Sequence, residues 1–89
     1  METQQIQTDF CQNVCKGFLL YCNDNRINIT QLFSNSKGKL ARQNVYAVAR
    51  GSKKYLSTIA LCYLAELLKF NTPTIFEQYY LNSKVTNSY

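Results

Sequence analysis

The stretch KGKLARQNVYAVARGSKK, residues 37–54, combines a short helical pattern with six of the ten Lys and Arg residues of the chain. The apolar residues that can share one face of this helix are Leu40, Val45, Val48 and Ala49. Gly51 follows them, and glycine is the residue best suited to the left-handed position that closes a helix. The stretch therefore predicts a helix over about residues 40–50, with one side in a core and the other side open to a partner.

Charge is distributed unevenly along the chain. Residues 25–65 hold seven positive side chains and no negative one, while the remainder holds three positive and five negative side chains. The net charge of +5 thus divides into +7 for the first set and −2 for the second. Such a concentration of one sign is typical of a protein whose partner is a polyanion.

Length and composition indicate one small domain. The 89 residues are enough for a single modest core,. The first residues, METQQIQTDF, lack the basic and apolar regions of a secretory signal, and the longest apolar block, residues 59–65, is far shorter than the roughly 20 residues that span a bilayer,. We therefore expect a soluble intracellular protein without a membrane partner.

No catalytic constellation is visible. The chain has no His, and neither a nucleophile elbow nor a glycine-rich phosphate loop occurs. The carboxylates of Asp9, Asp24, Glu66 and Glu77 are scattered among the expected helices and their ends. The sequence therefore predicts no enzyme, no catalytic residue and no cofactor.

Four cysteines, Cys11, Cys15, Cys22 and Cys62, raise the question of a metal site. Because His is missing, four thiolates would be the only conventional zinc ligands, and the paired Cys-x-x-Cys spacing of structural zinc sites does not occur. The first three recur at helical spacing among apolar residues, where cysteine usually acts as a small buried hydrophobe. We predict core thiols and no metal site, with a metal site or disulfides as the alternatives.

Apolar periodicity predicts five helices and no strand. They cover about residues 8–22, a short segment after Asn28, residues 40–50, residues 57–70 and a segment from Thr72-Pro73 to about residue 81. Thr8 with Asp9, Asn28 with Gln31, Ser57 or Thr58, and Thr72 provide capping residues. Residues 1–7 are expected to be a flexible N-terminus, residues 8–81 the domain and residues 82–89 a polar tail.

The last two helices carry most of the large apolar residues. The fourth is apolar nearly all round, which predicts that it is the core helix, with Ile59, Leu61, Leu64, Leu67 and Leu68 buried. The fifth carries more aromatic surface than a small monomer is expected to bury, so we predict a homodimer. The predicted dimer interface comprises Ile75, Phe76, Tyr79 and Tyr80, with the fourth helix contributing.

One family resembles this pattern. Val45, Val48, Arg50 and Gly51, followed by Ser52-Lys53-Lys54, resemble the recognition-helix end, glycine and basic loop of the Cro and lambda-repressor-like helix-turn-helix family, also called the Xre family. Thr30-Gln31 resemble the pair that opens the second helix of that family, and Leu61, Leu64, Ala65 and Leu68 fit its apolar fourth helix. The resemblance covers about residues 30–76. It departs from the family at Ala49, where an acidic residue is usual, and in a basic loop without proline.

The resemblance implies an all-α, compact five-helix domain with a lambda-repressor-like helix-turn-helix. It also implies a repressor-type transcription regulator that binds double-stranded DNA as a homodimer, on half-sites about one helical turn apart. The implied location is the cytoplasm, with a bacterial, plasmid or phage origin.

Arg can pair with guanine, and Gln or Asn with adenine, so the polar side of the third helix is predicted to read bases while flanking residues contact phosphates. The predicted DNA-binding residues are Gln31, Lys37, Lys39, Arg42, Gln43, Asn44, Tyr46, Ala47, Arg50, Ser52, Lys53 and Lys54. A shift of one residue in the turn around Gly38 would rotate the third helix by about 100° and exchange Gln43 and Asn44 as the leading base reader. The alternative function is a protein-interaction module, such as an antitoxin or an antagonist of another regulator, that binds an acidic protein surface.

Overall fold

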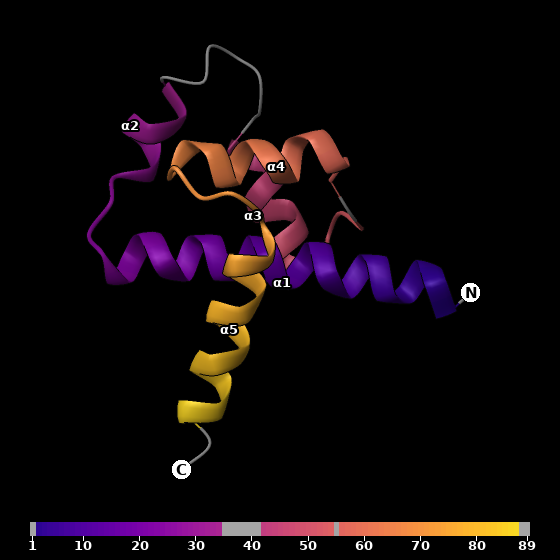
Figure 1. Ribbon diagram of the computed structural model, residues 1–89. Helices are drawn as coiled ribbons and strands as arrows, with labels where there is room; N and C mark the ends of the chain where they lie inside the picture. Colours follow the sequence, from indigo (N-terminus) through magenta and orange to yellow (C-terminus); the bar gives the residue numbers. More distant parts are fainter. Residues whose placement is uncertain (1, 35–41, 55, 88–89) are drawn as a thin grey trace.

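Five helices lie in the part of the chain that the computed structural model describes (Figure 1). They are α1 (Glu2–Asp24), α2 (Ile29–Ser34), α3 (Arg42–Arg50), α4 (Thr58–Leu67) and α5 (Thr74–Asn87). The structure describes residues 2–34, 42–54 and 56–87, and the side chains of residues 9–34, 42–54 and 56–84. No strand occurs in these ranges, so the predicted all-α class is confirmed.

Helix α1 is the centre of the packing. It runs through the middle of the view, with α3 and α4 on one side and α5 crossing it, and its closest packing is with α5 and then α3 (Figure 1). Its residues Val14, Cys15, Phe18 and Cys22 are all completely buried, and their spacing places them on one face. The prediction that the fourth helix is the core helix was therefore wrong, because α1 has the most extensive packing with other helices. On α4 and just after it, Leu61 and Leu64 are buried and Leu67 and Leu68 are partly buried, but Ile59 is exposed.

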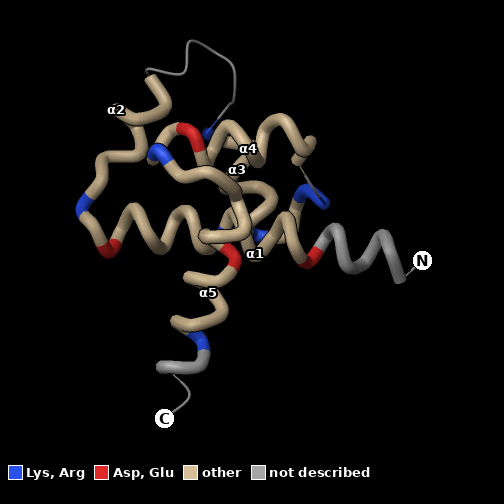
Figure 2. Tube along the Cα trace, in the orientation of Figure 1, with Lys and Arg blue, Asp and Glu red and all other residues tan. Residues whose placement is uncertain are grey.

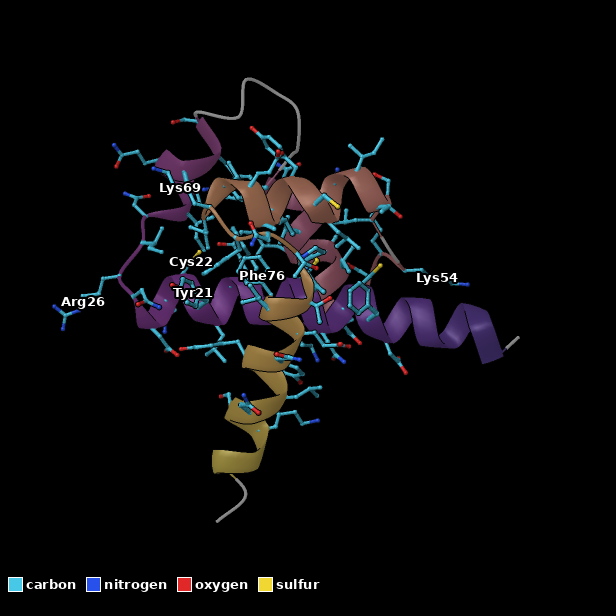
Figure 3. All side chains as sticks on the ribbon, in the orientation of Figure 1. Tyr21, Cys22, Arg26, Lys54, Lys69 and Phe76 are labelled. Atoms are coloured by element: carbon cyan, nitrogen blue, oxygen red, sulfur yellow. The ribbon has the colours of Figure 1, made fainter. Side chains whose placement is uncertain are left out.

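The contact between α1 and α5 is built from aromatic rings and one glycine. The ring of Phe18 meets that of Phe76 edge to face, with the centroids 5.3 Å apart, and Tyr21 and Phe70 complete the cluster around Phe76. Figure 3 shows Tyr21 and Phe76 at this crossing. At Gly17 the two backbones come so close that an added Cβ atom would lie 1.8 Å from the carbonyl oxygen of Phe76. Only glycine permits this approach.

Several helix ends follow the local signals in the sequence. The Asn28 side chain accepts a hydrogen bond from the N–H of Gln31 at 3.1 Å, and the Ser57 hydroxyl accepts one from the N–H of Ala60 at the same distance. Gly51 has φ +86° and ends α3. Its N–H donates to Val48 O, and the next N–H, that of Ser52, donates to Ala47 O, which is the Schellman arrangement,.

Other helix ends differ from the prediction. Helix α1 begins at Glu2 rather than near residue 8, since the Gln and Glu residues of this stretch favour helix and an acidic residue suits the first turn,. Helix α5 continues to Asn87, so the predicted polar tail is largely helical. Helix α4 ends at Leu67, and Lys69 adopts φ 63° just beyond it. Apolar periodicity did not predict these extra helical residues, because polar residues with ordinary helix propensity can extend a helix without adding to its apolar pattern.

Candidate nucleic-acid interface

The orientation of α3 is fixed by its apolar side. Val45 and Val48 are completely buried, and the side-chain amide of Gln12 on α1 donates to Ala49 O at 3.3 Å. The buried valines fix the orientation of α3 about its own axis, and the hydrogen bond from Gln12 holds its C-terminal end against α1. The predicted inward face is confirmed for Val45 and Val48, while Leu40 lies outside the described residues.

The opposite side of α3 surrounds a shallow hollow of about 580 Å³. Its lining residues are Arg42, Gln43, Asn44, Tyr46, Ala47 and Arg50, so six of the predicted contact residues lie together. Gln43 is exposed and Asn44 is half-buried. The rotation of the helix therefore makes Gln43, rather than Asn44, the more accessible amide.

No carboxylate lies on α2 or α3. Figure 2 shows acidic positions on α1, α4 and α5. Basic positions lie on α3 and in the loop that follows it, and also on α1, on α5 and in the loops before α2 and after α4. A negatively charged ligand that approaches the hollow would meet Arg42 and Arg50 on the same helix without facing an acidic neighbour on that helix. This distribution raises the local concentration of polyanions.

A polar contact joins α2 to α3. The Arg42 guanidinium donates a hydrogen bond from Nη1 to the hydroxyl of Thr30. Gln31, which was predicted to contact DNA, is exposed and lines a separate hollow of about 210 Å³ with Ile27, Asn28 and Leu32. The structure therefore does not place Gln31 in the hollow of α3.

The basic loop leaves the end of α3 in an exposed position. Ser52, Lys53 and Lys54 are all exposed, but the Ser52 hydroxyl donates to Ala47 O at 3.2 Å. Ser52 therefore closes the helix, whereas the ammonium groups of the two lysines are the charged groups that the loop offers to a phosphate. Lys37, Lys39 and the turn around Gly38 lie outside the described residues.

The cysteines are free thiols. Cys11, Cys15 and Cys22 are buried as predicted, but Cys62 is exposed on α4, on the same side of the helix as the exposed residues Ile59 and Glu66. In the described ranges no group of three or more His, Cys, Asp or Glu residues is arranged to hold a metal ion.

Most of the predicted dimer residues are buried or make contacts within the single chain. Phe76 is completely buried, so it cannot contribute to a surface in this structure. The Tyr79 hydroxyl donates to Asp24 Oδ2 at 2.5 Å, and this hydrogen bond is the main cause that raises the pKa of Tyr79. The ring of Tyr80 lies 5.4 Å from Lys16 Nζ and 5.6 Å from Lys84 Nζ. Ile75 is half-buried.

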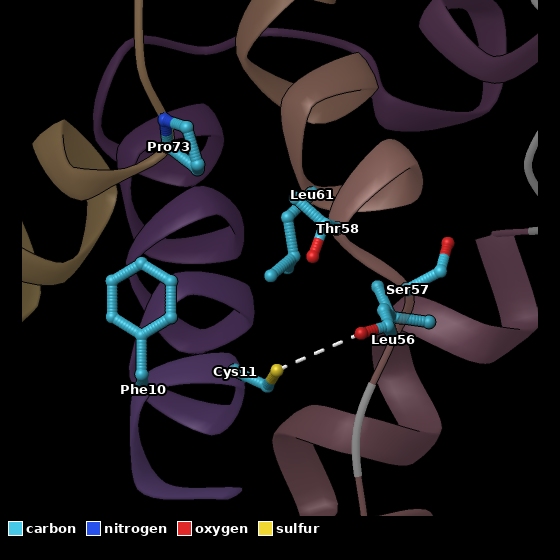
Figure 4. Close-up of a pocket in the computed structure, with 7 residues that line it drawn as sticks. All are labelled: Phe10, Cys11, Leu56, Ser57, Thr58, Leu61 and Pro73. Atoms are coloured by element: carbon cyan, nitrogen blue, oxygen red, sulfur yellow. Dashed lines mark hydrogen bonds between the residues drawn. The ribbon is translucent and has the colours of Figure 1, made fainter. Parts of the chain in front are cut away.

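A further hollow, of about 390 Å³, was not predicted (Figure 4). Its lining residues are Phe10, Cys11, Leu56, Ser57, Thr58, Leu61 and Pro73, and the Cys11 thiol donates to Leu56 O across 3.8 Å. The lining comes from three separate parts of the sequence, and no local pattern indicates that they meet.

The chain matches none of the protein-family models, curated proteins or solved structures with which it was compared. The likeness to Cro and lambda-repressor-like proteins thus depends on the residues quoted above. None of the helices in the described ranges has the length and apolar content needed to cross a membrane.

Proposed function

We propose that this chain is a sequence-specific double-stranded DNA-binding transcription regulator of the repressor type. The observation that carries the proposal is the outer face of α3, where Gln43 lies exposed between Arg42 and Arg50 on a helix without a carboxylate. An α-helix fits the major groove, and amide and guanidinium groups can pair bidentately with adenine and guanine. In this proposal α3 reads the bases, and helix-turn-helix proteins use their second motif helix in the same way.

Phosphate contacts come from the residues that follow α3. Lys53 and Lys54 are exposed directly after the turn at Gly51, so they extend beyond the end of the helix that enters the groove. Lysine and arginine contacts to phosphates supply affinity and orientation, while base contacts supply sequence preference. The regulator acts as a homodimer on two half-sites about one helical turn apart.

The test is a measurement of duplex DNA affinity as a function of salt concentration. The variant changes the four described basic residues of this face to Gln: Arg42, Arg50, Lys53 and Lys54. We expect roughly a tenfold or greater loss of affinity, and a salt slope that becomes shallower by about one unit for each phosphate contact removed. The affinity can be followed by fluorescence anisotropy of a labelled duplex at several salt concentrations.

A matched control separates this face from net charge. It changes four other basic residues to Gln and lowers the net charge by the same amount: Lys16, Arg26, Lys69 and Lys84. Figure 3 shows Arg26 and Lys69 on the opposite side of the view from Lys54. The control variant is expected to keep most of the affinity. Equal losses in both variants, or no binding of duplex DNA by the native chain at low salt, would refute the proposal, and the second result would favour an acidic protein partner.

The orientation of α3 leads to a second prediction, which concerns the preference for DNA sequence. Changing Gln43 to Ala should reduce discrimination between the selected site and a site with one altered base pair by about 2 kcal/mol, because a bidentate amide contact is lost. Asn44 is less accessible, so Asn44→Ala should change discrimination much less. Site selection from random duplex DNA, followed by competition assays with both variants, measures the difference. The opposite order of effects would contradict the proposed orientation of α3.

A further inference from the structure

The outer face of α4 holds the most exposed large apolar side chain of the described residues. Ile59 is 83% exposed, and Cys62 and Glu66, which are also exposed, follow it on the same side of the helix,. The opposite side of α4 carries the buried residues Leu61, Leu64 and Ala65. Helix α4 therefore fills the core with one face and presents an uncovered Ile and Cys with the other.

The outer face of α4 carries no basic side chain. Helix α4 contains no Lys or Arg, and neither does the short helix α2, whereas α1, α3 and α5 each carry at least one. The chain has a net charge of +5, so two copies repel each other wherever their basic faces approach,. The outer face of α4 lets two copies meet without placing like charges opposite each other.

The face is also complementary to itself in an antiparallel arrangement. Thr58 lies four residues before Cys62, and Glu66 lies four residues after it. If two α4 helices cross antiparallel about a two-fold axis near Cys62, the carboxylate of Glu66 faces Thr58 in the first turn of α4 in the second copy. A carboxylate is favourable at the positive N-terminal end of a helix, and the exposed Thr58 hydroxyl can donate a hydrogen bond to it,. The two-fold symmetry repeats this contact at the other end.

From these observations we infer that the outer face of α4 is the surface on which a second copy of this chain binds, with the two α4 helices antiparallel and Cys62 near the axis. This inference gives the homodimer of the proposed function a specific interface. The biological role of that interface rests on the proposed function. It replaces the aromatic face of α5, where Phe76 is buried inside the single chain. Ile59 of each copy is the apolar anchor, and Glu66 fixes the antiparallel orientation.

The first experiment measures molecular mass by sedimentation equilibrium on the full chain without DNA. Ile59→Asp is expected to raise the dimer Kd at least about tenfold, because it places a carboxylate where each copy buries an apolar side chain. Leu81→Asp is the matched control, since Leu81 on α5 is the other large apolar residue that is exposed among the described residues, at 43%. It should dimerise like the native chain. Circular dichroism checks that both variants keep their helices.

The second experiment tests the orientation. A short bifunctional maleimide should join two native chains through Cys62, because the thiols of Cys11, Cys15 and Cys22 are buried. Cys62→Ser and Ile59→Asp should each abolish the cross-linked dimer, and Glu66→Lys should reduce it because the Lys would face the positive end of the other helix.

Three results would overturn the inference: a native chain that remains monomeric at about 0.5 mM, an Ile59→Asp variant that dimerises like the native chain, or loss of the dimer in Leu81→Asp alone. These results leave the function of α3 open to its own test. A monomeric Ile59→Asp variant can still be assayed on a duplex with a single half-site, where retained affinity shows that DNA binding and dimerisation are separate. Absence of DNA binding in a chain that does dimerise would instead refute the proposed function alone.

Discussion

Replacing Gly17 with Ala is expected to destabilise the domain by about 3 kcal/mol, although Ala favours helix over Gly by about 1 kcal/mol at an unhindered position. The added Cβ atom would lie 1.8 Å from the carbonyl oxygen and 2.6 Å from the carbonyl carbon of Phe76. Both are backbone atoms, so a side-chain rotation cannot relieve the overlap. Helix α5 would have to move away from α1, which would open the aromatic cluster around Phe76.

Chemical denaturation followed by circular dichroism measures this loss in the free energy of unfolding. Asn23→Ala is a suitable control, because Asn23 is exposed near the end of the same helix and its replacement should change stability by less than about 0.5 kcal/mol,. A Gly17→Ala variant as stable as the native chain would mean that α5 does not cross α1 at this distance.

Stability is also expected to fall steeply as the pH rises above about 9. Burial, with a smaller contribution from the neighbouring Cys11, raises the pKa of Cys15 from 9.0 to about 12, and burial raises the pKa of Cys22 to about 11. The unfolded chain releases these protons near the ordinary pKa, whereas the folded chain retains them. The stabilisation is therefore complete below pH 9 and is lost as the pH rises through 11 and 12. For Cys15 the shift of about three units corresponds to about 4 kcal/mol, at about 1.4 kcal/mol per unit,.

Urea denaturation between about pH 8 and about pH 11 gives the slope of the free energy of unfolding against pH. Cys15→Ala should lower that slope, since the variant has no thiol at this position to ionise on unfolding. The raised pKa of Tyr79 also makes the free energy of unfolding fall as the pH rises. The slope measured for Tyr79→Phe therefore shows how much Tyr79 contributes. Equal slopes in the native chain and Cys15→Ala would show that the Cys15 thiol is not buried in solution.

The sequence predicted the features that depend on neighbouring residues. The caps at Asn28 and Ser57 and the closure of α3 at Gly51 each depend on a hydrogen bond or a φ angle within a few residues, and all three are present. The amphipathic pattern of α3 likewise predicted that Val45 and Val48 are buried. Most of the candidate DNA-binding residues could be grouped for the same reason, because they share one short helix and the loop after it.

Features that depend on packing between distant segments were not predictable in this way. Helix α4 is apolar on nearly every side, so its pattern contains no information on which side faces the core, and Ile59 proved to be exposed. In the same way, the aromatic residues of α5 gave no sign that Tyr21, Phe70 and Phe18 would surround Phe76. The closeness of two backbones at Gly17 depends on the crossing of α1 and α5, for which a single glycine in a helix is only a weak indication,.

The crossing of α1 and α5 has a consequence for synthesis on the ribosome. Because α1 buries its apolar face mainly against α5 and α3, a nascent chain that has reached α4 still lacks the partner that covers Gly17 and Phe18. Contacts between segments far apart in sequence form late and slowly. Until α5 has left the exit tunnel, the nascent chain exposes aromatic and apolar surface that chaperones can bind. Stalled or truncated products that lack α5 should therefore be prone to aggregation and proteolysis.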